Sequence, residues 1–285
     1  MSRQKIFDIA ILQNQYASLQ YGASNPNIIN CIEAQIYSQN GEDGILLYIF
    51  SKIGVKNHQF VEFGIESGRE CNTANLSLNF GWHGLLIEAS AEDAKKAKNY
   101  YDSLLKDKKN QVKIVRAMVT PENINQLFAK HNIDPNLDLL SIDIDSNDYW
   151  VWDALTIIKP RLVVIEYNAS LGPTKSISVK YQPNFDRYRF HKSGYYHGAS
   201  LSALTHLAKS KGYALVGCDL HGINAFFVQQ DLISNDLPEL TPEESYFEHS
   251  IRIAAMSTDK QFDLIKHLPF DEIIVGSRKY LAKKD

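Results

Sequence analysis

Carboxylates gather at the ends of two successive apolar segments of the chain. Asp143, Asp145 and Asp148 stand at the end of the first segment, and Glu166 and Asn168 at the end of the second. Carboxylates this close together repel one another unless a cation, protonation or hydrogen bonds compensate. Alternation along extended strands places Asp143 with Asp145, and Glu166 with Asn168, on common faces. Oxygen ligands from two adjacent strand ends suit Mg²⁺, so we predict a metal site formed by Asp145, Glu166 and Asn168.

Two other interpretations of these carboxylates stay open. Asp145 and Asp148 could cap the helix that follows, while Asp143 or Glu166 orders a site through hydrogen bonds. The spacing Asp143-Ile144-Asp145 also occurs in glycosyltransferases that hold a nucleotide sugar through a metal. Here the Asp143-Ile144-Asp145 segment ends the fourth apolar strand of the chain and follows a glycine-containing turn. This position favours a class of enzyme other than the glycosyltransferases.

The second candidate site is the turn at 62–68. Gly64 permits a tight turn after an apolar strand, and Gly68 lets the backbone approach a ligand. Glu88 follows Gly64 by 24 residues, close to the ~20-residue offset of an acidic residue that binds ribose hydroxyls. Glu62 and Glu66 would repel a pyrophosphate and attract a cation. The turn therefore predicts a nucleoside ligand that is cationic at this end.

These residues require a scaffold of alternating strands and helices, in which ligands bind at the carboxyl ends of the strands. Apolar runs predict strands at 60–63, 85–88, 112–115, 139–143, 162–166, 213–217 and 225–228. Amphipathic segments predict helices at 92–105, 121–131, 149–158 and 200–211. The short connection at 220–223 predicts that the last two strands form an antiparallel hairpin.

The predicted fold is α/β, with a Rossmann-like sheet of seven strands that ends in this hairpin. Residues 1–57 are expected to form a helical N-terminal cap, 58–230 the core, and 231–285 a helical C-terminal extension.

Over residues 37–229 the chain resembles class I S-adenosylmethionine-dependent methyltransferases, in particular the FkbM-like and related enzymes that modify sugars and natural products. The resemblance rests on the turn at 62–68, Glu88, the segment 141–145, the terminal hairpin and the polar stretch 37–44. It implies that Glu62 and Gly64 lie beside the methionine moiety of S-adenosylmethionine and that Glu88 binds its ribose. The cofactor-binding residues predicted on this basis are Gln39, Glu62, Gly64, Glu66, Ser67, Glu88 and Asp143.

Methyl transfer from a sulfonium needs an in-line nucleophile, and a base when the acceptor is a hydroxyl or a protonated amine. His191 and His197, in the polar and aromatic segment 168–198, are candidate bases, although each could equally be a solvent-exposed loop histidine. Together with the carboxylates this predicts Asp145, Glu166 and His197 as catalytic residues.

A basic and aromatic stretch in this segment is interpreted as a substrate-facing loop. Its basic members are Lys175, Lys180, Arg187, Arg189 and Lys192. With a formal net charge of -3 and a pI near 6.3, the chain shows no general attraction to phosphate backbones, so nucleic acid is not expected as a partner.

The expected activity is therefore O- or N-methylation of a small-molecule or glycan-linked acceptor, with a role in surface-polysaccharide biosynthesis implied by the resemblance alone. The alternatives are a metal-dependent nucleotide-sugar transferase and a noncatalytic module that keeps the fold. No stretch approaches the ~18 apolar residues of a membrane span, and no signal-peptide core follows Met1, so we expect a cytoplasmic protein. Oligomeric state is left open.

Overall fold

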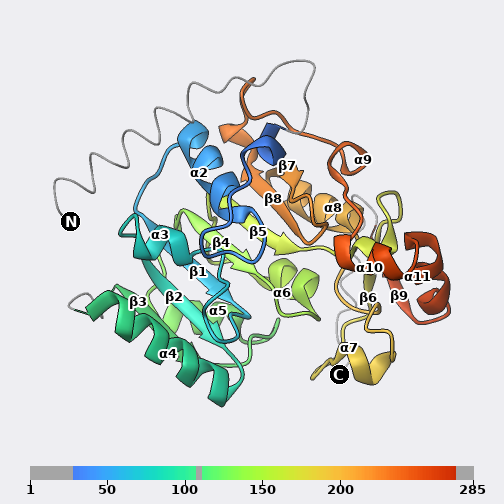
Figure 1. Cartoon of the computed structure of the whole chain (residues 1–285), viewed down its shortest axis with the longest axis horizontal. Helices are drawn as coiled ribbons and strands as arrows, with labels where there is room; N and C mark the ends of the chain where they lie inside the picture. Colours follow the sequence, from blue (N-terminus) through green and yellow to red (C-terminus); the bar gives the residue numbers. More distant parts are fainter. Residues whose placement is uncertain (1–27, 107–110, 274–285) are drawn as a thin grey trace, which may run out of the picture.

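The computed structural model describes residues 28–106 and 111–273 (Figure 1). Its centre is a seven-stranded sheet in the order β3-β2-β1-β4-β5-β8-β7. The strands are β1 (Gln59–Phe63), β2 (His83–Glu88), β3 (Val112–Arg116), β4 (Leu139–Ile142), β5 (Leu162–Glu166), β7 (Tyr213–Cys218) and β8 (Asn224–Gln229). β1 to β5 are parallel, whereas β8 runs antiparallel to both β5 and β7. The predicted α/β fold with a terminal hairpin is confirmed.

Alternation of side chains along the strands builds a separate apolar core on each face of the sheet. In β5, Val163 and Ile165 join one core, while Leu162 and Val164 join the other. Both faces of a parallel sheet must be covered by helices, because each carries apolar side chains. α5 (Ile124–Lys130), α6 (Asp148–Ala154) and α8 (Leu201–Lys211) cover the first face. η1 (Ile28–Ile32), α2 (Glu42–Ile53), α3 (Ala74–Leu78) and α4 (Ala91–Leu105) cover the second.

Helix starts follow local capping chemistry. Ser90 accepts a hydrogen bond from the Asp93 amide at the start of α4, and Ser200 accepts one from the Ala203 amide at the start of α8. Both hydroxyls satisfy amides that have no partner within their helix. α5 and α6 are shorter than the segments predicted for them, and α6 starts at Asp148 rather than Tyr149.

Several elements were not predicted individually, although residues 231–285 were expected to be helical. The segment 168–198 contains η3 (Ala169–Leu171), β6 (Ile177–Val179) and α7 (Arg187–Phe190), and the C-terminal part contains η4 (Gln230–Leu232), α9 (Pro242–Ser245), α10 (Ser250–Ala255), α11 (Thr258–Ile265) and β9 (Phe270–Glu272). β6 and β9 pair in an antiparallel two-stranded sheet. In Figure 1, α10, α11 and β9 lie beside β6, whereas α9 lies beside α8. The extension is thus not purely helical, because β9 pairs with a strand inserted after β5.

The ends of the chain are described in part. η1 and α2 of the predicted N-terminal cap pack against the sheet, and residues 1–27 of that cap and 274–285 of the extension lie outside the described residues. Within the described ranges, no helix is both long and apolar enough to cross a membrane.

Candidate functional site

A cavity of about 660 Å³ opens at the carboxyl ends of β1, β2, β4 and β5. The residues predicted to bind the cofactor line its wall, with the exception of Glu62: they are Gln39, Gly64, Glu66, Ser67, Glu88 and Asp143. Asp145 and Glu166 line it as well, together with Tyr181, Phe185, Arg187 and Arg252. The topology therefore brings both candidate sites of the sequence together in one cavity, where ligands of open α/β sheets usually bind.

Gly64 makes the close approach of β1 and β4 possible. Its φ is +83°, and a Cβ atom built on it would lie 1.4 Å from the Asp143 carbonyl oxygen. No other residue type fits this position without moving the backbone of one strand end. The glycine predicted in this turn is therefore required by the short distance between the ends of β1 and β4.

The Glu62 carboxylate is hydrogen-bonded within the protein and does not line the cavity. Its buried carboxylate accepts hydrogen bonds from the Asn72 amide at 2.8 Å and from the Thr73 amide at 3.0 Å. The Thr73 hydroxyl donates to it at 2.6 Å, and the Ser141 hydroxyl at 3.3 Å. Burial raises the pKa of Glu62. The carboxylate thereby ties the start of α3 to the ends of β1 and β4; its predicted contact with the cofactor stays a prediction.

Glu88 clamps the glycine turn against the end of β2. One carboxylate oxygen accepts from the Glu66 amide at 2.8 Å, and the other accepts from the Ser90 amide at 2.8 Å. Glu66 adopts a left-handed conformation with φ +47°. Each carboxylate oxygen has a second lone pair, so Glu88 can hold this turn and still accept hydrogen bonds from a ribose.

The polar stretch around Gln39 forms a loop that closes on the start of α2. The buried Asp43 carboxylate accepts from the amides of Ile36, Tyr37 and Ser38 at 2.6 to 2.9 Å. The Ser38 hydroxyl accepts from the Asp43 amide at 3.2 Å. The Ser38 hydroxyl thus satisfies an amide in the first turn of α2. This loop holds Gln39 at the cavity wall.

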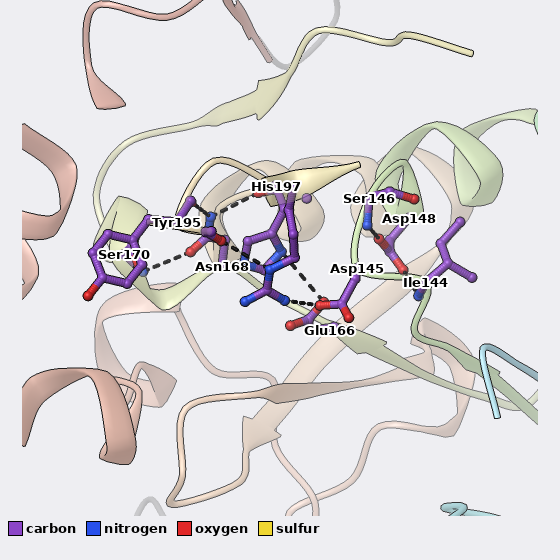
Figure 2. Close-up of polar contacts among 12 residues, drawn as sticks. Ile144, Asp145, Ser146, Asp148, Glu166, Asn168, Ser170, Tyr195 and His197 are labelled. Atoms are coloured by element: carbon purple, nitrogen blue, oxygen red, sulfur yellow. Dashed lines mark hydrogen bonds and ion pairs between the residues drawn. The ribbon is translucent and has the colours of Figure 1, made fainter. Parts of the chain in front are cut away.

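Asp145, Glu166 and His197 come together near the ends of β4 and β5, and their side chains point toward one another in Figure 2. One potential ligand atom from each lies within 4.8 Å of the others. His197 Nδ1 is 3.7 Å from Glu166 Oε2. His197 is fully buried and does not line the cavity, so it lies behind Glu166 as seen from the cavity. Neither of its ring nitrogens has a hydrogen-bond partner among the described residues.

The electrostatics of this cluster favour a neutral histidine and a readily protonated glutamate. Burial lowers the pKa of His197 well below its usual value, and the cationic Arg252 and Arg187 lower it further. Burial raises the pKa of Glu166, and the charges of Asp143 and Asp145 raise it further. Such a carboxylate is a stronger base than an ordinary glutamate.

Asp148 organises the loop that carries Asp145. Its carboxylate accepts from the Ile144 amide at 2.7 Å and from the Ser146 amide at 3.0 Å (Figure 2). Burial raises the pKa of Asp148 to about 6. Asp145 sits in this loop at φ +55°, and its carboxylate pairs with the Arg187 guanidinium.

Asn168 holds the loop that carries His197. Its amide nitrogen donates to the carbonyls of Tyr195 at 2.7 Å and of His197 at 2.8 Å. Its oxygen accepts from the Ser170 amide at 3.0 Å and from Arg252 at 3.3 Å. Both the nitrogen and the oxygen of this side-chain amide are therefore hydrogen-bonded within the protein. His197, rather than Asn168, has a potential ligand atom close to the carboxylates of Asp145 and Glu166.

Sequence reasoning found Arg187 only as part of a basic stretch, and it missed Arg252. Of that stretch, Arg187 lines the cavity, whereas Arg189 is exposed and Lys175 lies over the ring of Phe262. Arg252 stands on a short C-terminal helix, and no motif around it signals a site. The candidate base His191 contacts the Ser193 hydroxyl at 2.7 Å and does not line the cavity.

No family model matches the chain, and no curated protein matches it. Among solved structures, an O-methyltransferase from Bacillus cereus in complex with S-adenosylhomocysteine is similar at 12% identity, covering 80% of this chain and 90% of that one with a TM-score of 0.39. Magnesium protoporphyrin IX methyltransferase from Synechocystis PCC 6803 with bound S-adenosylmethionine is similar at 10% identity, covering 78% and 97% with a TM-score of 0.42. An S-adenosylmethionine-dependent methyltransferase from Clostridium acetobutylicum is similar at 10% identity, covering 65% and 89% with a TM-score of 0.41.

Proposed function

We propose that this protein is an S-adenosylmethionine-dependent methyltransferase. The observation that carries the proposal is the glycine turn, which faces the cavity with Glu66 and is held there by Glu88. Carboxylates at this position repel a pyrophosphate and attract the ammonium and sulfonium groups of S-adenosylmethionine. The Glu88 oxygens offer acceptors to the ribose hydroxyls, as expected at the end of the second strand.

Calorimetry of the full chain tests this assignment. We expect S-adenosylhomocysteine to bind, and we expect NAD⁺ and UDP-glucose, which both carry a pyrophosphate, not to compete with it. Binding of UDP-glucose without binding of S-adenosylhomocysteine would replace the proposal by a nucleotide-sugar transferase. Cofactor binding without turnover over a broad acceptor panel would support a noncatalytic module instead.

The reaction proposed is methylation of an oxygen or nitrogen on a small-molecule or glycan-linked acceptor, as in surface-polysaccharide biosynthesis. We place the acceptor at the end of the cavity that carries Glu166, called the acceptor end below. Tyr181 and Phe185 also line the cavity, and aromatic side chains suit sugar rings. Glu166 lies on the cavity wall and is the proposed general base, while His197 acts through Glu166 from behind. When bound, S-adenosylmethionine would supply the methyl group and leave as the thioether S-adenosylhomocysteine, and Glu166 would take the proton that the acceptor atom loses.

A metal-dependent reaction, with a divalent cation bound by Asp145 and Glu166, is the second candidate function. It is favoured because one potential ligand atom each of Asp145, Glu166 and His197 lies within 4.8 Å of the others. Asn168 does not complete this set, because its oxygen already accepts from Ser170 and Arg252. A ligand set with one imidazole nitrogen suits Zn²⁺ better than Mg²⁺. In the structure Arg187 already supplies a positive charge at Asp145, which does not fit the predicted Mg²⁺ site.

We therefore expect methyl transfer to survive removal of metal. Protein treated with EDTA and then dialysed should keep its rate within about twofold, because Arg187 compensates the Asp145 charge. The measurement is transfer of a labelled methyl group before and after addition of Mg²⁺, Mn²⁺ or Zn²⁺. Loss of activity on chelation that one of these ions restores would establish the metal site.

A further inference from the structure

Two arginines from outside the main sheet reach the same cavity. Arg187 comes from α7, in the segment inserted after β5, and Arg252 comes from α10, in the C-terminal extension. Both line the cavity at the end that Glu166 also lines. Glu66 comes instead from the turn after β1, and Glu88 is the last residue of β2. The cavity wall thus combines an acidic cofactor side with a second side that carries two guanidinium groups.

Arg187 is held in place by the protein itself. Its guanidinium pairs with the Asp145 carboxylate, and its Nε donates to the Gly194 carbonyl at 3.1 Å. The guanidinium also lies over the ring of Tyr188, with 5.3 Å between its carbon and the ring centroid. Arg187 therefore presents a fixed positive group whose charge is largely balanced by Asp145.

Arg252 is different, because its contacts within the protein are long and neutral. Nη1 donates to Asn168 Oδ1 at 3.3 Å and to Ser170 Oγ at 3.4 Å. The guanidinium carbon lies 5.9 Å from the centroid of the Tyr195 ring. Among residues 28–106 and 111–273, no carboxylate lies within ion-pair distance of Arg252. An arginine has five N–H donors, and none of these contacts uses Nη2 or Nε.

Arg252 thus has guanidinium N–H groups without a paired carboxylate, although the Glu166 and Asp145 charges act on it from a longer distance. Burial lowers the pKa of Arg252, and the Glu166 carboxylate opposes this change only in part. Placing a guanidinium in a cavity without a paired carboxylate costs free energy, and a bound anion removes that cost. A guanidinium fork recognises planar carboxylates and phosphates through two parallel hydrogen bonds.

We propose that the methyl acceptor carries a carboxylate or a phosphate monoester, which Arg252 binds with help from Arg187. The anionic group would hold the acceptor at the Glu166 end of the cavity, with its reacting hydroxyl or amine toward the cofactor. This inference rests on the proposed methyltransferase function, because it assigns the two arginines to the acceptor and the acidic turns to S-adenosylmethionine.

The test measures anion binding to protein saturated with S-adenosylhomocysteine. The probes are D-glucuronate, D-glucose 6-phosphate and, as the neutral partner, D-glucose. One of the anions is expected to bind at least tenfold more tightly than glucose, and the anion that does so decides between carboxylate and phosphate. Arg252→Gln should weaken that binding about tenfold or more, since it removes charge-assisted hydrogen bonds. Arg252→Lys keeps the charge without the fork and should show an intermediate loss.

The matched control is Arg189→Gln, which removes the same charge from the exposed side of α7. It should change anion binding by less than twofold, and all variants should bind S-adenosylhomocysteine like the wild type. The inference is overturned if neither anion binds better than glucose, or if Arg252→Gln binds it unchanged. A variant that loses S-adenosylhomocysteine instead would assign Arg252 to the cofactor's own carboxylate. Failure of the wild type to bind S-adenosylhomocysteine would reject the proposed function itself.

Discussion

Replacing Glu88 by alanine should weaken the binding of S-adenosylhomocysteine by about tenfold to a hundredfold. A hydrogen bond from a ribose hydroxyl to a carboxylate contributes roughly 1.5–3 kcal/mol, and each 1.4 kcal/mol is a factor of ten in affinity. The loss has a second source, because the Glu66 and Ser90 amides lose their acceptor and the turn is no longer held against β2. Calorimetry of the variant against the wild type gives the ratio directly.

Glu92→Ala is the matched control for this experiment. Glu92 lies in the first turn of α4, its side chain is 78% exposed, and it pairs with Lys96 on the surface. It removes the same charge close to Glu88 without touching the cavity, so cofactor affinity should stay within about twofold. A folded Glu88→Ala protein that binds S-adenosylhomocysteine as tightly as the wild type would refute the ribose assignment.

Replacing Glu166 by glutamine should lower the rate of methyl transfer by about 10²- to 10⁴-fold, the usual contribution of a general base. The affinity for S-adenosylhomocysteine should not change, because Glu166 lies at the acceptor end of the cavity. Single-turnover transfer of a labelled methyl group separates the two effects. Glu243→Gln, an exposed change on α9, is the control and should leave the rate unchanged.

The pH profile provides a sharper test of the same role. A base is active when deprotonated, so the rate should fall as pH drops through the pKa of Glu166, which burial and the neighbouring carboxylates raise above its usual value. Asp145→Asn removes one of these charges and frees the Arg187 guanidinium, and both changes lower the pKa of Glu166. The acid limb should therefore move to lower pH. An unmoved limb in a folded variant would show that another group titrates.

His197 has a measurable role only if it acts through Glu166. His197→Gln should lower the rate of methyl transfer and shift the acid limb of its pH profile, since the buried ring lies 3.7 Å from the Glu166 carboxylate. His191→Ala serves as its control, because His191 lies in the same segment but away from the cavity wall. Equal pH profiles for wild type and His197→Gln would leave His197 with a packing role alone.

The spacing of apolar residues and the residue types in the turns were sufficient to predict the seven-stranded sheet. All seven predicted strands lie within or beside observed strands, because apolar runs bounded by charged or glycine residues leave little choice of element. The short strands β6 and β9 escaped prediction for the opposite reason. Each has three residues, with partly exposed positions, and forms only because the other lies beside it. Pairing between residues 177–179 and 270–272 is a property of the folded chain.

The turn at 62–68 shows which site residues can be predicted from residue types alone. Gly64 and Glu88 could be identified from their places after two strands, and the topology brings both to the cavity. The hydrogen-bond partners of Glu62 in the same turn could not be predicted, because Asn72 and Thr73 belong to the unpredicted start of α3. A carboxylate that caps a neighbouring segment and one that faces a ligand look alike in sequence.

By itself, then, the sequence determined the sheet, its glycine turn and the carboxylates at the strand ends, since these depend on local periodicity and on the rule that parallel strands end at one edge. Only the tertiary structure decided which polar atoms remain for a ligand. The side-chain amide of Asn168 is hydrogen-bonded within the protein, and His197 lies close to Glu166. Arg252, from the C-terminal part of the chain, lines the cavity. These outcomes depend on contacts between distant segments, and no local pattern encodes them.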